Sequence, residues 1–374
     1  MSGLITDIMF PNKFATWRNV EIKSFIKNFD VDILVFKVDG FAGNKFDFDW
    51  DFINEDNLLN EYNILIFDEK YNDINKYNKN IDGTKFNGKF NGSYLLTKNQ
   101  DFNLSSYDFV YHIFLMNYLS FNKNYRFEKT KQFIHLYPGG GISDPKFVSL
   151  IDQNTNIIST YPLTTDSIKK LNYLNYIELK CGTLMDKNDS FFTRPIKKNN
   201  QTLNICFSSM GVEDDKGNDT YYSLVEYYKD FPEKNIKFFG LGNVKKDNNI
   251  ECHQPMDYKS LGKFYRDNID VYINLETGKF LNGWPLGIES IINGSVLITT
   301  DVHNVHDRYF FQNSGIFVIK TFRDLIRTVE YLNDNKELLQ HYSNITQHNI
   351  EKYISYENNQ EKIFNYIKKI IYKK

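Results

Sequence analysis

The chain has 374 residues, 41% of them hydrophobic and 25% charged, which excludes wholesale disorder and favours two domains over one. A formal net charge of −2 excludes broad electrostatic binding to nucleic acid, which needs a basic face. Three cysteines without a CxxC pair indicate neither a disulfide framework nor a zinc site. No apolar run reaches the roughly 18 residues of a membrane span, and the N-terminus has no signal-peptide pattern, so we expect a soluble, cytoplasmic protein.

The N-terminal half contains short, nearly continuous apolar runs, which are typical of parallel strands covered on both faces. These runs are residues 4–10, 31–38, 63–67, 107–115, 132–137, 156–160 and 176–180. After the first run, residues 16–29 place Ile22, Phe25, Ile26 and Phe29 at helical spacing. A strand–helix–strand start predicts a doubly wound domain. Residues 40–62 and 69–103, rich in Asn, Asp and Gly, are predicted to be long loops.

A second α/β series follows the polar stretch 186–202, which we interpret as a linker. Its predicted strands are 203–209, 236–242, 271–275 and 296–301, and its predicted helices are 220–231, 258–267 and 287–293. Helical patterns continue from about residue 321 to a basic amphipathic end, EKIFNYIKKIIYKK. The fold class predicted is α/β, with two doubly wound domains facing a central cleft, where ligands usually bind.

The stretch NGWPLGIESIINGSVLITTD (282–301) is the most informative about chemistry. A Gly/Pro turn at a helix N-terminus offers free amide N–H groups and a positive dipole end, which suit a diphosphate. A carboxylate early in that helix, Glu289, can accept two hydrogen bonds from a ribose diol. The alternative interpretation is an ordinary loop–helix–strand connection.

A second candidate is the turn after residues 203–209, with small residues Ser208, Ser209 and Gly211 and then Lys216–Gly217 before a helix. A lysine at this place can neutralise a phosphate. The alternative is a solvated loop lysine.

In order and spacing, FSSMG, Lys216–Gly217, FFGLG with Gly240, and GIESIINGSVLITTD resemble the C-terminal domain of the family-four GT-B glycosyltransferases. The resemblance covers residues 203–320 and extends more weakly to IELKCGTLMD (177–186). It implies the GT-B fold and sugar transfer from a nucleotide-sugar donor with retention of configuration. It also implies that neither a metal nor a cofactor is needed.

By this resemblance Glu289 holds the donor ribose and Lys216 contacts the donor diphosphate. Gly283, Trp284, Pro285 and Leu286 match the family's loop whose amides face the phosphate and the transferred sugar. The family's first Glu, eight residues before the second, is Leu281 here, and Asn282 or Glu276 is expected to substitute for it.

The N-terminal half departs further from the family. The segment PNKFATWR (11–18), with Asn12 and Arg18, replaces the Gly-Gly turn after the first strand. At the place of the family's cleft histidine, YPGGG has Pro138, with His135 three residues upstream and Gly139 and Gly140 after it. These residues are our candidates for the acceptor side. A core histidine is nevertheless the preferred interpretation of His112 and His135, since both lie in apolar strands.

The predicted domains are 1–185, which binds the acceptor, and 186–350, which binds the donor. In the final segment, 351–374, we expect a helix that packs back on the first domain. An alternative has its basic residues dock on an anionic membrane. The expected partners are a nucleotide sugar and an acceptor, most often a glycan. The expected chemistry is positioning and charge stabilisation at the leaving diphosphate.

Several rival functions remain open. A metal-dependent GT-A transferase would use Asp47, Asp49 and Asp51 of DFDWD (47–51) as metal ligands. A GT-B-shaped epimerase or phosphorylase shares the fold without sharing the reaction. A catalytically inactive carbohydrate-binding subunit is a third rival, because the family's first Glu is missing.

Overall fold

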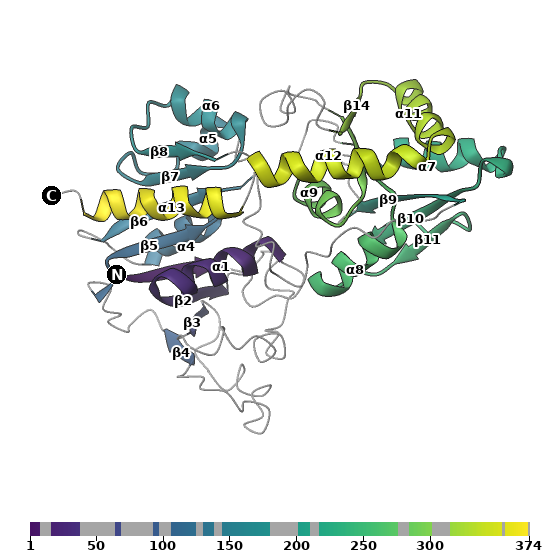
Figure 1. The fold of residues 1–374 in the computed structure, drawn as a ribbon. Helices are drawn as coiled ribbons and strands as arrows, with labels where there is room; N and C mark the ends of the chain where they lie inside the picture. Colours follow the sequence, from purple (N-terminus) through teal and green to yellow (C-terminus); the bar gives the residue numbers. More distant parts are fainter. Residues whose placement is uncertain are drawn as a thin grey trace. The chain divides into compact units, whose positions relative to one another are not determined.

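The computed structural model describes residues 1–7, 16–37, 64–68, 93–96, 106–124, 130–137, 144–179, 201–209, 217–275, 284–300, 315–353 and 356–372. The chain divides into two compact units. Unit 1 comprises Met1–Tyr137, Ile142–Leu179 and Asn359–Lys374, and unit 2 comprises Pro138–Gly141 and Lys180–Asn358. Figure 1 shows a parallel sheet with helices on its faces in each unit.

Unit 1 contains an eight-stranded parallel sheet of order β4-β3-β2-β1-β5-β6-β7-β8. Its strands are β1 (Ser2–Asp7), β2 (Asp30–Lys37), β3 (Ile64–Asp68), β4 (Ser93–Leu96), β5 (Phe109–Ile113), β6 (Lys131–Leu136), β7 (Asn156–Ser159) and β8 (Tyr176–Glu178). The chain proceeds from β1 to β4 in one direction and then returns to the other side of β1 with β5. A topological switch point therefore lies between β1 and β5.

The helices of unit 1 cover both faces of this sheet. They are α1 (Thr16–Asn28), α4 (Leu115–Asn124), α5 (Pro145–Val148), α6 (Pro162–Lys170) and, from the end of the chain, α13 (Tyr356–Ile371). On one face, Phe25 of α1 packs against Phe109 and Tyr111 of β5. The other face of β5 carries His112, whose ring contacts Tyr118 and Phe121 of α4. Because helices cover both faces of β5, its run is nearly continuous in apolar residues.

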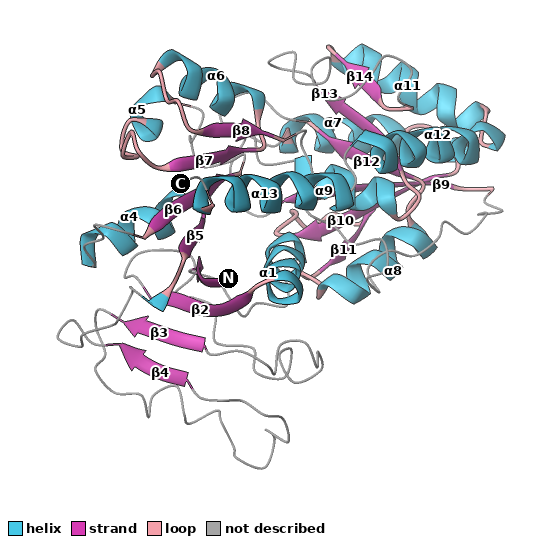
Figure 2. Cartoon of the chain, turned by 60° about the vertical axis from the view of Figure 1, so that its left-hand side comes forward, coloured by secondary structure: helices cyan, strands magenta, loops and turns pink. Residues whose placement is uncertain are grey.

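Unit 2 contains a six-stranded parallel sheet of order β11-β10-β9-β12-β13-β14, whose strands are drawn in magenta in Figure 2. Its strands are β9 (Leu203–Ser209), β10 (Ile236–Gly242), β11 (Ile250–His253), β12 (Val271–Asn274), β13 (Val296–Thr300) and β14 (Phe317–Ile319). Its helices are α7 (Asn218–Lys229), α8 (Tyr258–Asn268), α9 (Trp284–Ile292), α11 (Phe322–Asp334) and α12 (Glu337–Tyr353). Here the switch point lies between β9 and β12.

The core of unit 2 joins α7 and α11 to one face of the sheet. Tyr221 of α7 stacks on Phe207 of β9, with ring centroids 4.6 Å apart. Leu325 and Val329 of α11 are fully buried in the same cluster. Thr321 and Asp324 close the start of α11 with a reciprocal capping box, which satisfies amides that the first turn would leave free.

Three short edge strands differ from the sequence predictions. The segment predicted as a loop over 69–103 contains the edge strand β4, and the edge strands β11 and β14 were not predicted. These strands have three or four residues, too few to show a periodicity. The predicted boundary at 185/186 lies outside the described residues.

Helix α13 packs on the same face of the unit 1 sheet as α1. Its Phe364 makes edge-on contacts with Phe25 and Phe29, at centroid distances of 5.2 and 4.9 Å. Its Ile363 and Ile367 are fully buried, so the apolar side of this basic helix is already covered by protein. Among the described residues, no helix combines the length and the apolarity of a membrane span.

We expect Phe364→Ala to lower the free energy of unfolding by about 3 to 5 kcal/mol, because it removes a ring that is 7% exposed and leaves a cavity. The matched change Lys368→Ala, on the exposed side of α13, is expected to stay within about 0.5 kcal/mol. Urea denaturation of the two variants measures both values. Equal stabilities would contradict the packing role of α13.

Candidate functional site

The carboxyl ends of β9 and β12 meet at the switch point of unit 2, the place where open α/β sheets bind ligands. Ser208 and Ser209 end β9 and are 9% and 1% exposed. The hydroxyl of Ser208 lies 2.5 Å from the phenol oxygen of Tyr272 in β12. Ser209 Oγ accepts a hydrogen bond from Asn218 Nδ2 at 3.5 Å, which links the strand end to the start of α7. Two residues predicted to bind the nucleotide-sugar donor are thus held in place at the carboxyl ends of the strands.

Gly217 is the N-cap of α7 and adopts a left-handed backbone with φ of 69°. A Cβ at this position would lie 2.4 Å from Leu275 Cβ and 2.6 Å from the Leu275 carbonyl oxygen. Only glycine therefore lets the N-terminus of α7 approach the end of β12 so closely. The N-terminus of α7, with its positive dipole end, consequently lies near the end of β12, as an anion site requires.

Gly217→Ala is expected to cost about 2 to 4 kcal/mol of unfolding free energy, from an unfavourable φ and a clash with backbone. The control is Gly287→Ala, a glycine inside α9 whose added Cβ would meet the side-chain atom Leu297 Cδ2 at 3.3 Å. That change is expected to stay within about 1 kcal/mol, since alanine favours the helix and Leu297 can adjust. Thermal or urea unfolding compares the two, and similar losses would argue against the close approach at Gly217.

Glu289 lies on α9 and is 3% exposed. No hydrogen bond joins its carboxylate to another described residue, and its charge acts on two buried tyrosines. Burial is the first cause that raises the pKa of Tyr265 and of Tyr272, and Glu289 contributes to both shifts. Burial raises the pKa of the Glu289 carboxyl itself to about 8. A buried carboxyl with so perturbed a pKa marks a candidate functional group.

The raised pKa makes stability depend on pH. The ordinary value for Glu is 4.5, so between pH 4.5 and about 8 the folded chain holds a proton that the unfolded chain has released. The free energy of unfolding is therefore expected to fall as pH rises through this window, by up to roughly 1.4 kcal/mol per pH unit. Glu289→Gln should remove this slope. Urea unfolding at several pH values tests it, and parallel curves for wild type and variant would contradict the buried carboxyl.

Three of the predicted donor-loop residues, Trp284, Pro285 and Leu286, lie in the first turn of α9 and not in a loop. Pro fits this turn because its missing N–H would have no helical partner there. As a consequence Glu289 is the sixth residue of the helix and lies in its second turn, one turn later than the sequence predicted. In sequence, α9 is the next described helix after β12, and residues 275–283 separate the two.

Gly240 lies within β10, and the space beside it is filled by Val244, whose Cγ1 would be 2.7 Å from an added Cβ. The close packing against Val244 is thus one reason why this position is a glycine. The predicted contact of Gly240 with the nucleotide-sugar donor stays a prediction. Several other predicted site residues lie outside the described ranges: Asn12, Gly139, Gly140, Gly211, Lys216, Glu276, Asn282 and Gly283.

A second set of buried polar groups lies in unit 1, where β1 and β5 end. Arg18 of α1 forms an ion pair with Asp7 of β1, with 2.6 Å between Nη1 and Oδ1. The two side chains are 3% and 0% exposed. The guanidinium also lies over the ring of Phe114, which follows β5 with a positive φ of 79°. Burial lowers the pKa of Arg18, and Asp7 opposes that shift.

Glu21, one helical turn after Arg18, is the acceptor for three side chains that come from β5, from β6 and from the residue after β6. Tyr111 of β5 donates its hydroxyl to Glu21 Oε1 at 2.5 Å, and Tyr137 donates to Oε2. His135 Nδ1 lies 2.6 Å from Oε1, and its ring packs on Tyr137 with centroids 3.9 Å apart. Burial is the largest cause that raises the pKa of Tyr111 and Tyr137 far above the ordinary value, and Glu21 adds to it.

The two predicted acceptor-side residues that the structure describes, Arg18 and His135, thus belong to one buried polar group at one edge of the sheet. Asp7, Glu21 and Tyr137 were not predicted as site residues. For Glu21 a signal was present, because Arg18 and Glu21 continue the helical stripe of Ile22 and Phe25 toward the N-terminus of α1. Charged residues on a buried stripe indicate a paired, buried cluster.

For His112 the preferred interpretation as a core histidine is confirmed. Its Nδ1 lies 2.8 Å from Thr6 Oγ1 and its Nε2 lies 3.2 Å from Gln132 Oε1. Within the described ranges, no three His, Cys, Asp or Glu side chains gather into a group that could hold a metal ion. The DFDWD segment (47–51) lies outside those ranges.

The comparisons with known proteins define the fold. No protein-family model and no curated protein sequence matches the chain. Among solved structures, Anabaena HepE in complex with UDP-glucose superposes with a TM-score of 0.67 at 11% identity, over 98% of each chain. A variant of S. aureus TarM bound to Fondaparinux, alpha-GlcNAc-glycerol and UDP gives 0.66 at 12%, over 98% of this chain and 99% of that one. Sucrose-phosphate synthase from Thermosynechococcus elongatus gives 0.64 at 8%, over 99% of both.

The class that these observations define is the GT-B fold, with two doubly wound Rossmann-like units in one chain. The fold class predicted from the sequence is confirmed. The likeness extends over nearly the whole chain, which includes the N-terminal half, where the motifs were weakest.

Proposed function

We propose that this chain is a glycosyltransferase that moves a sugar from a nucleotide-sugar donor to a glycan, with retention of configuration and without a metal or cofactor. The observation that carries the proposal is Glu289, a buried carboxyl without a hydrogen-bond donor among the described residues. Burying such a group is costly unless a ligand completes its hydrogen bonds. A ribose diol offers two donors to one carboxylate.

The surroundings of Glu289 support a diphosphate beside the ribose. The N-termini of α7 and α9 both follow strands that end at the switch point, and helix N-termini favour phosphate. Gly217 lets α7 come close to the end of β12, and Lys216 precedes it in sequence. These groups would stabilise the charge on the leaving diphosphate, which is the main demand of the transfer.

Retention of configuration is part of the proposal because the sequence resembles a retaining family. The described residues of unit 2 include no pair of carboxylates at the switch point, the arrangement by which glycosidases use a nucleophile and an acid. The proposed reaction is front-face attack, in which the acceptor hydroxyl bonds to the sugar as the diphosphate leaves and a donor phosphate oxygen takes the proton. The HepE structure with UDP-glucose and the TarM structure with Fondaparinux, alpha-GlcNAc-glycerol and UDP are consistent with this substrate class.

The test is calorimetric titration of the full chain with UDP-, GDP-, dTDP- and ADP-sugars, each with and without EDTA. We expect one nucleotide to bind, and EDTA to leave its dissociation constant unchanged. NMR of the product made from that donor, with a panel of oligosaccharide acceptors, should show the same anomeric configuration as the donor. Binding that requires a divalent cation, or an inverted product, would overturn the proposed mechanism, and the absence of any donor binding would overturn the proposed function.

A further inference from the structure

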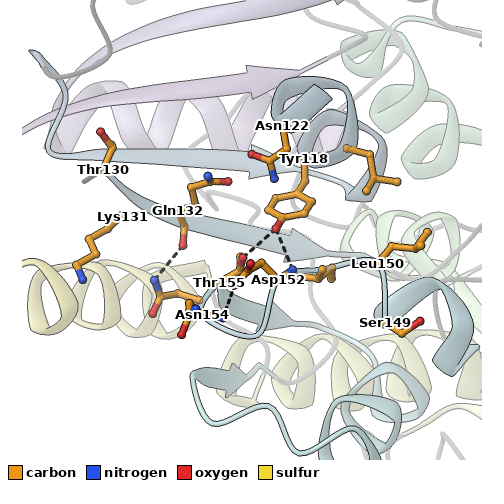
Figure 3. Close-up of a pocket in the computed structure, with 13 residues that line it drawn as sticks. Tyr118, Asn122, Thr130, Lys131, Gln132, Ser149, Leu150, Asp152, Asn154 and Thr155 are labelled. Carbon is orange, nitrogen blue, oxygen red and sulfur yellow. Dashed lines mark hydrogen bonds between the residues drawn. The ribbon is translucent and has the colours of Figure 1, made fainter. Parts of the chain in front are cut away.

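A hollow of about 700 Å³ lies in unit 1, at the amino ends of β6 and β7. Its walls come from the last turns of α4, the first residues of the two strands, and the turn between α5 and β7 (Figure 3). The volume is that of a small-molecule site. The hollow is at the opposite edge of the sheet from Arg18, Glu21 and His135, which lie where the strands end. It is therefore separate from the buried polar group described above.

The hollow is lined mainly by uncharged hydrogen-bonding side chains. Carboxamides come from Asn122, Gln132, Asn154 and Asn156, and hydroxyls come from Thr130, Ser149 and Thr155. One cation, Lys131, and one anion, Asp152, line it as well, so the lining residues bring no net charge. This balance gives no preference to a phosphate or another anion.

The wall around Tyr118 is built in a fixed arrangement. The Tyr118 hydroxyl lies 3.0 Å from Thr155 Oγ1 and accepts a hydrogen bond from the Asp152 amide at 3.0 Å, as the dashed lines of Figure 3 show. The amide of Asn154 donates to Asp152 Oδ1 at 2.7 Å, which holds that carboxylate in its turn. The turn between α5 and β7 is thus ordered before any ligand arrives, which lowers the entropic cost of binding.

Gln132 is oriented from the core behind it. Burial lowers the pKa of His112 to about 3, so its ring is neutral and carries one N–H. Because Gln132 Oε1 can only accept, that hydrogen is on Nε2 and is donated to Oε1 at 3.2 Å, and Nδ1 then accepts from the Thr6 hydroxyl. The two amide hydrogens of Gln132 are then left for the hollow that it lines. The hydrogen-bonded series Thr6–His112–Gln132 thus leaves the two N–H groups of the Gln132 amide as donors at this wall.

The ligand chemistry follows from this set of groups. Carboxamides, hydroxyls and one carboxylate offer donors and acceptors side by side, which matches vicinal hydroxyl groups. Leu150, 53% exposed at the rim, offers an apolar surface for the C–H face of a sugar ring. Tyr118 is 3% exposed, so its ring gives no platform on which a nucleobase could stack.

We propose that this hollow binds a neutral oligosaccharide segment, as a holding site for the glycan acceptor away from the reacting end. The assignment to an acceptor rests on the proposed function, whereas saccharide binding as such rests on the hollow alone. Strand β6 has six residues and spans roughly 20 Å, so the site is about that far from the edge where β6 ends. Only an acceptor of several sugars can occupy both places, so the site would select for long glycans.

The test is an array of short and long oligosaccharides probed with the full chain, followed by calorimetry with the best binder. The variant is Asn122→Ala/Lys131→Ala, because neither side chain has a hydrogen bond to another described residue. The control is Lys170→Ala/Asn175→Ala, two exposed residues of unit 1 outside the hollow. We expect the variant to weaken saccharide binding at least tenfold, and the control and Glu289→Gln to leave it unchanged.

Failure of this inference and failure of the proposed function are distinguishable. A wild-type protein that binds no saccharide, or a variant that binds as tightly as the control, would overturn the holding site whatever the donor titration gives. Saccharide binding that is lost in the Asn122/Lys131 variant, in a protein that binds no nucleotide sugar, would retain the site and overturn only the transfer reaction. Unchanged circular dichroism of both double variants shows that the fold is intact.

Discussion

Replacing Glu289 with glutamine is expected to weaken donor binding by about ten- to a hundredfold above pH 8, without loss of the fold. The carboxylate can accept two charge-assisted hydrogen bonds from a ribose diol, whereas the glutamine amide accepts through one oxygen and presents N–H groups to the second hydroxyl. Glutamine has nearly the same volume, so the packing of α9 is kept. Calorimetric titration with the nucleotide sugar that binds wild type measures the change.

The same carboxyl should make donor affinity depend on pH. In the free protein its pKa is about 8, and only the charged form is the full acceptor that the diol needs. Wild-type affinity is therefore expected to rise between about pH 6 and pH 8 and then level off. The diphosphate diester of a nucleotide sugar does not titrate in this range, so the Glu289→Gln variant should show a flat profile.

The control variant is Glu226→Gln, on α7, where the side chain is 71% exposed and pairs with Lys229 at the surface. It is expected to bind donor as wild type does. If Glu289→Gln bound donor as tightly as Glu226→Gln across the pH range, Glu289 would have no place in the donor site. The donor site would then have to be sought elsewhere on unit 2.

The second large effect is expected at Glu21. Its replacement by alanine removes the common acceptor of Tyr111, Tyr137 and His135 and leaves these donors buried. Removing one partner of a buried charged cluster typically costs about 3 to 5 kcal/mol of unfolding free energy. Glu21→Gln should lose less, because one carbonyl oxygen can still accept from the tyrosines.

The matched control is Glu178→Ala at the edge strand β8, whose carboxylate is 34% exposed and lies 3.9 Å from Lys169 Nζ. Exposed pairs of this kind contribute at most about 1 kcal/mol. Hydrogen exchange of peptides from β5 and β6 reads unit 1 separately from unit 2. We expect faster exchange there for Glu21→Ala only, and equal protection in both variants would show that the cluster is not a stabilising centre.

Much of the fold could be predicted from apolar periodicity. The predicted strands 203–209 and 236–242 coincide with β9 and β10, and residues 16–29 differ from α1 by one residue at the C-terminal end. These elements are buried on their inner faces, so their patterns are dense. The edge strands β4, β11 and β14 escaped prediction because half of their pairing surface is open and their sequences are short and mixed.

The candidate sites also differ in how far they could be predicted from the sequence. Glu289 could be found because a motif of consecutive residues surrounds it. The stripe on α1 marks Glu21 as buried, but its partners Tyr111, His135 and Tyr137 could not be found, because they lie at least 90 residues away in sequence. The hollow beside Asn122 and Gln132 is likewise assembled from separate segments. A sequence therefore reveals a site whose residues lie in one motif, but it does not reveal a site assembled from segments that are far apart in the chain.

The return of α13 to unit 1 has a consequence for synthesis of the protein on the ribosome. Unit 2 is almost continuous and can complete its core as soon as residue 358 has emerged. Phe25 and Phe29 are synthesised early, but their rings can pack on Phe364 only after about 330 further residues have been added. At roughly 5 to 20 residues per second this is a delay of about 20 to 70 s. The half of the chain that is translated first is therefore the half that finishes folding last.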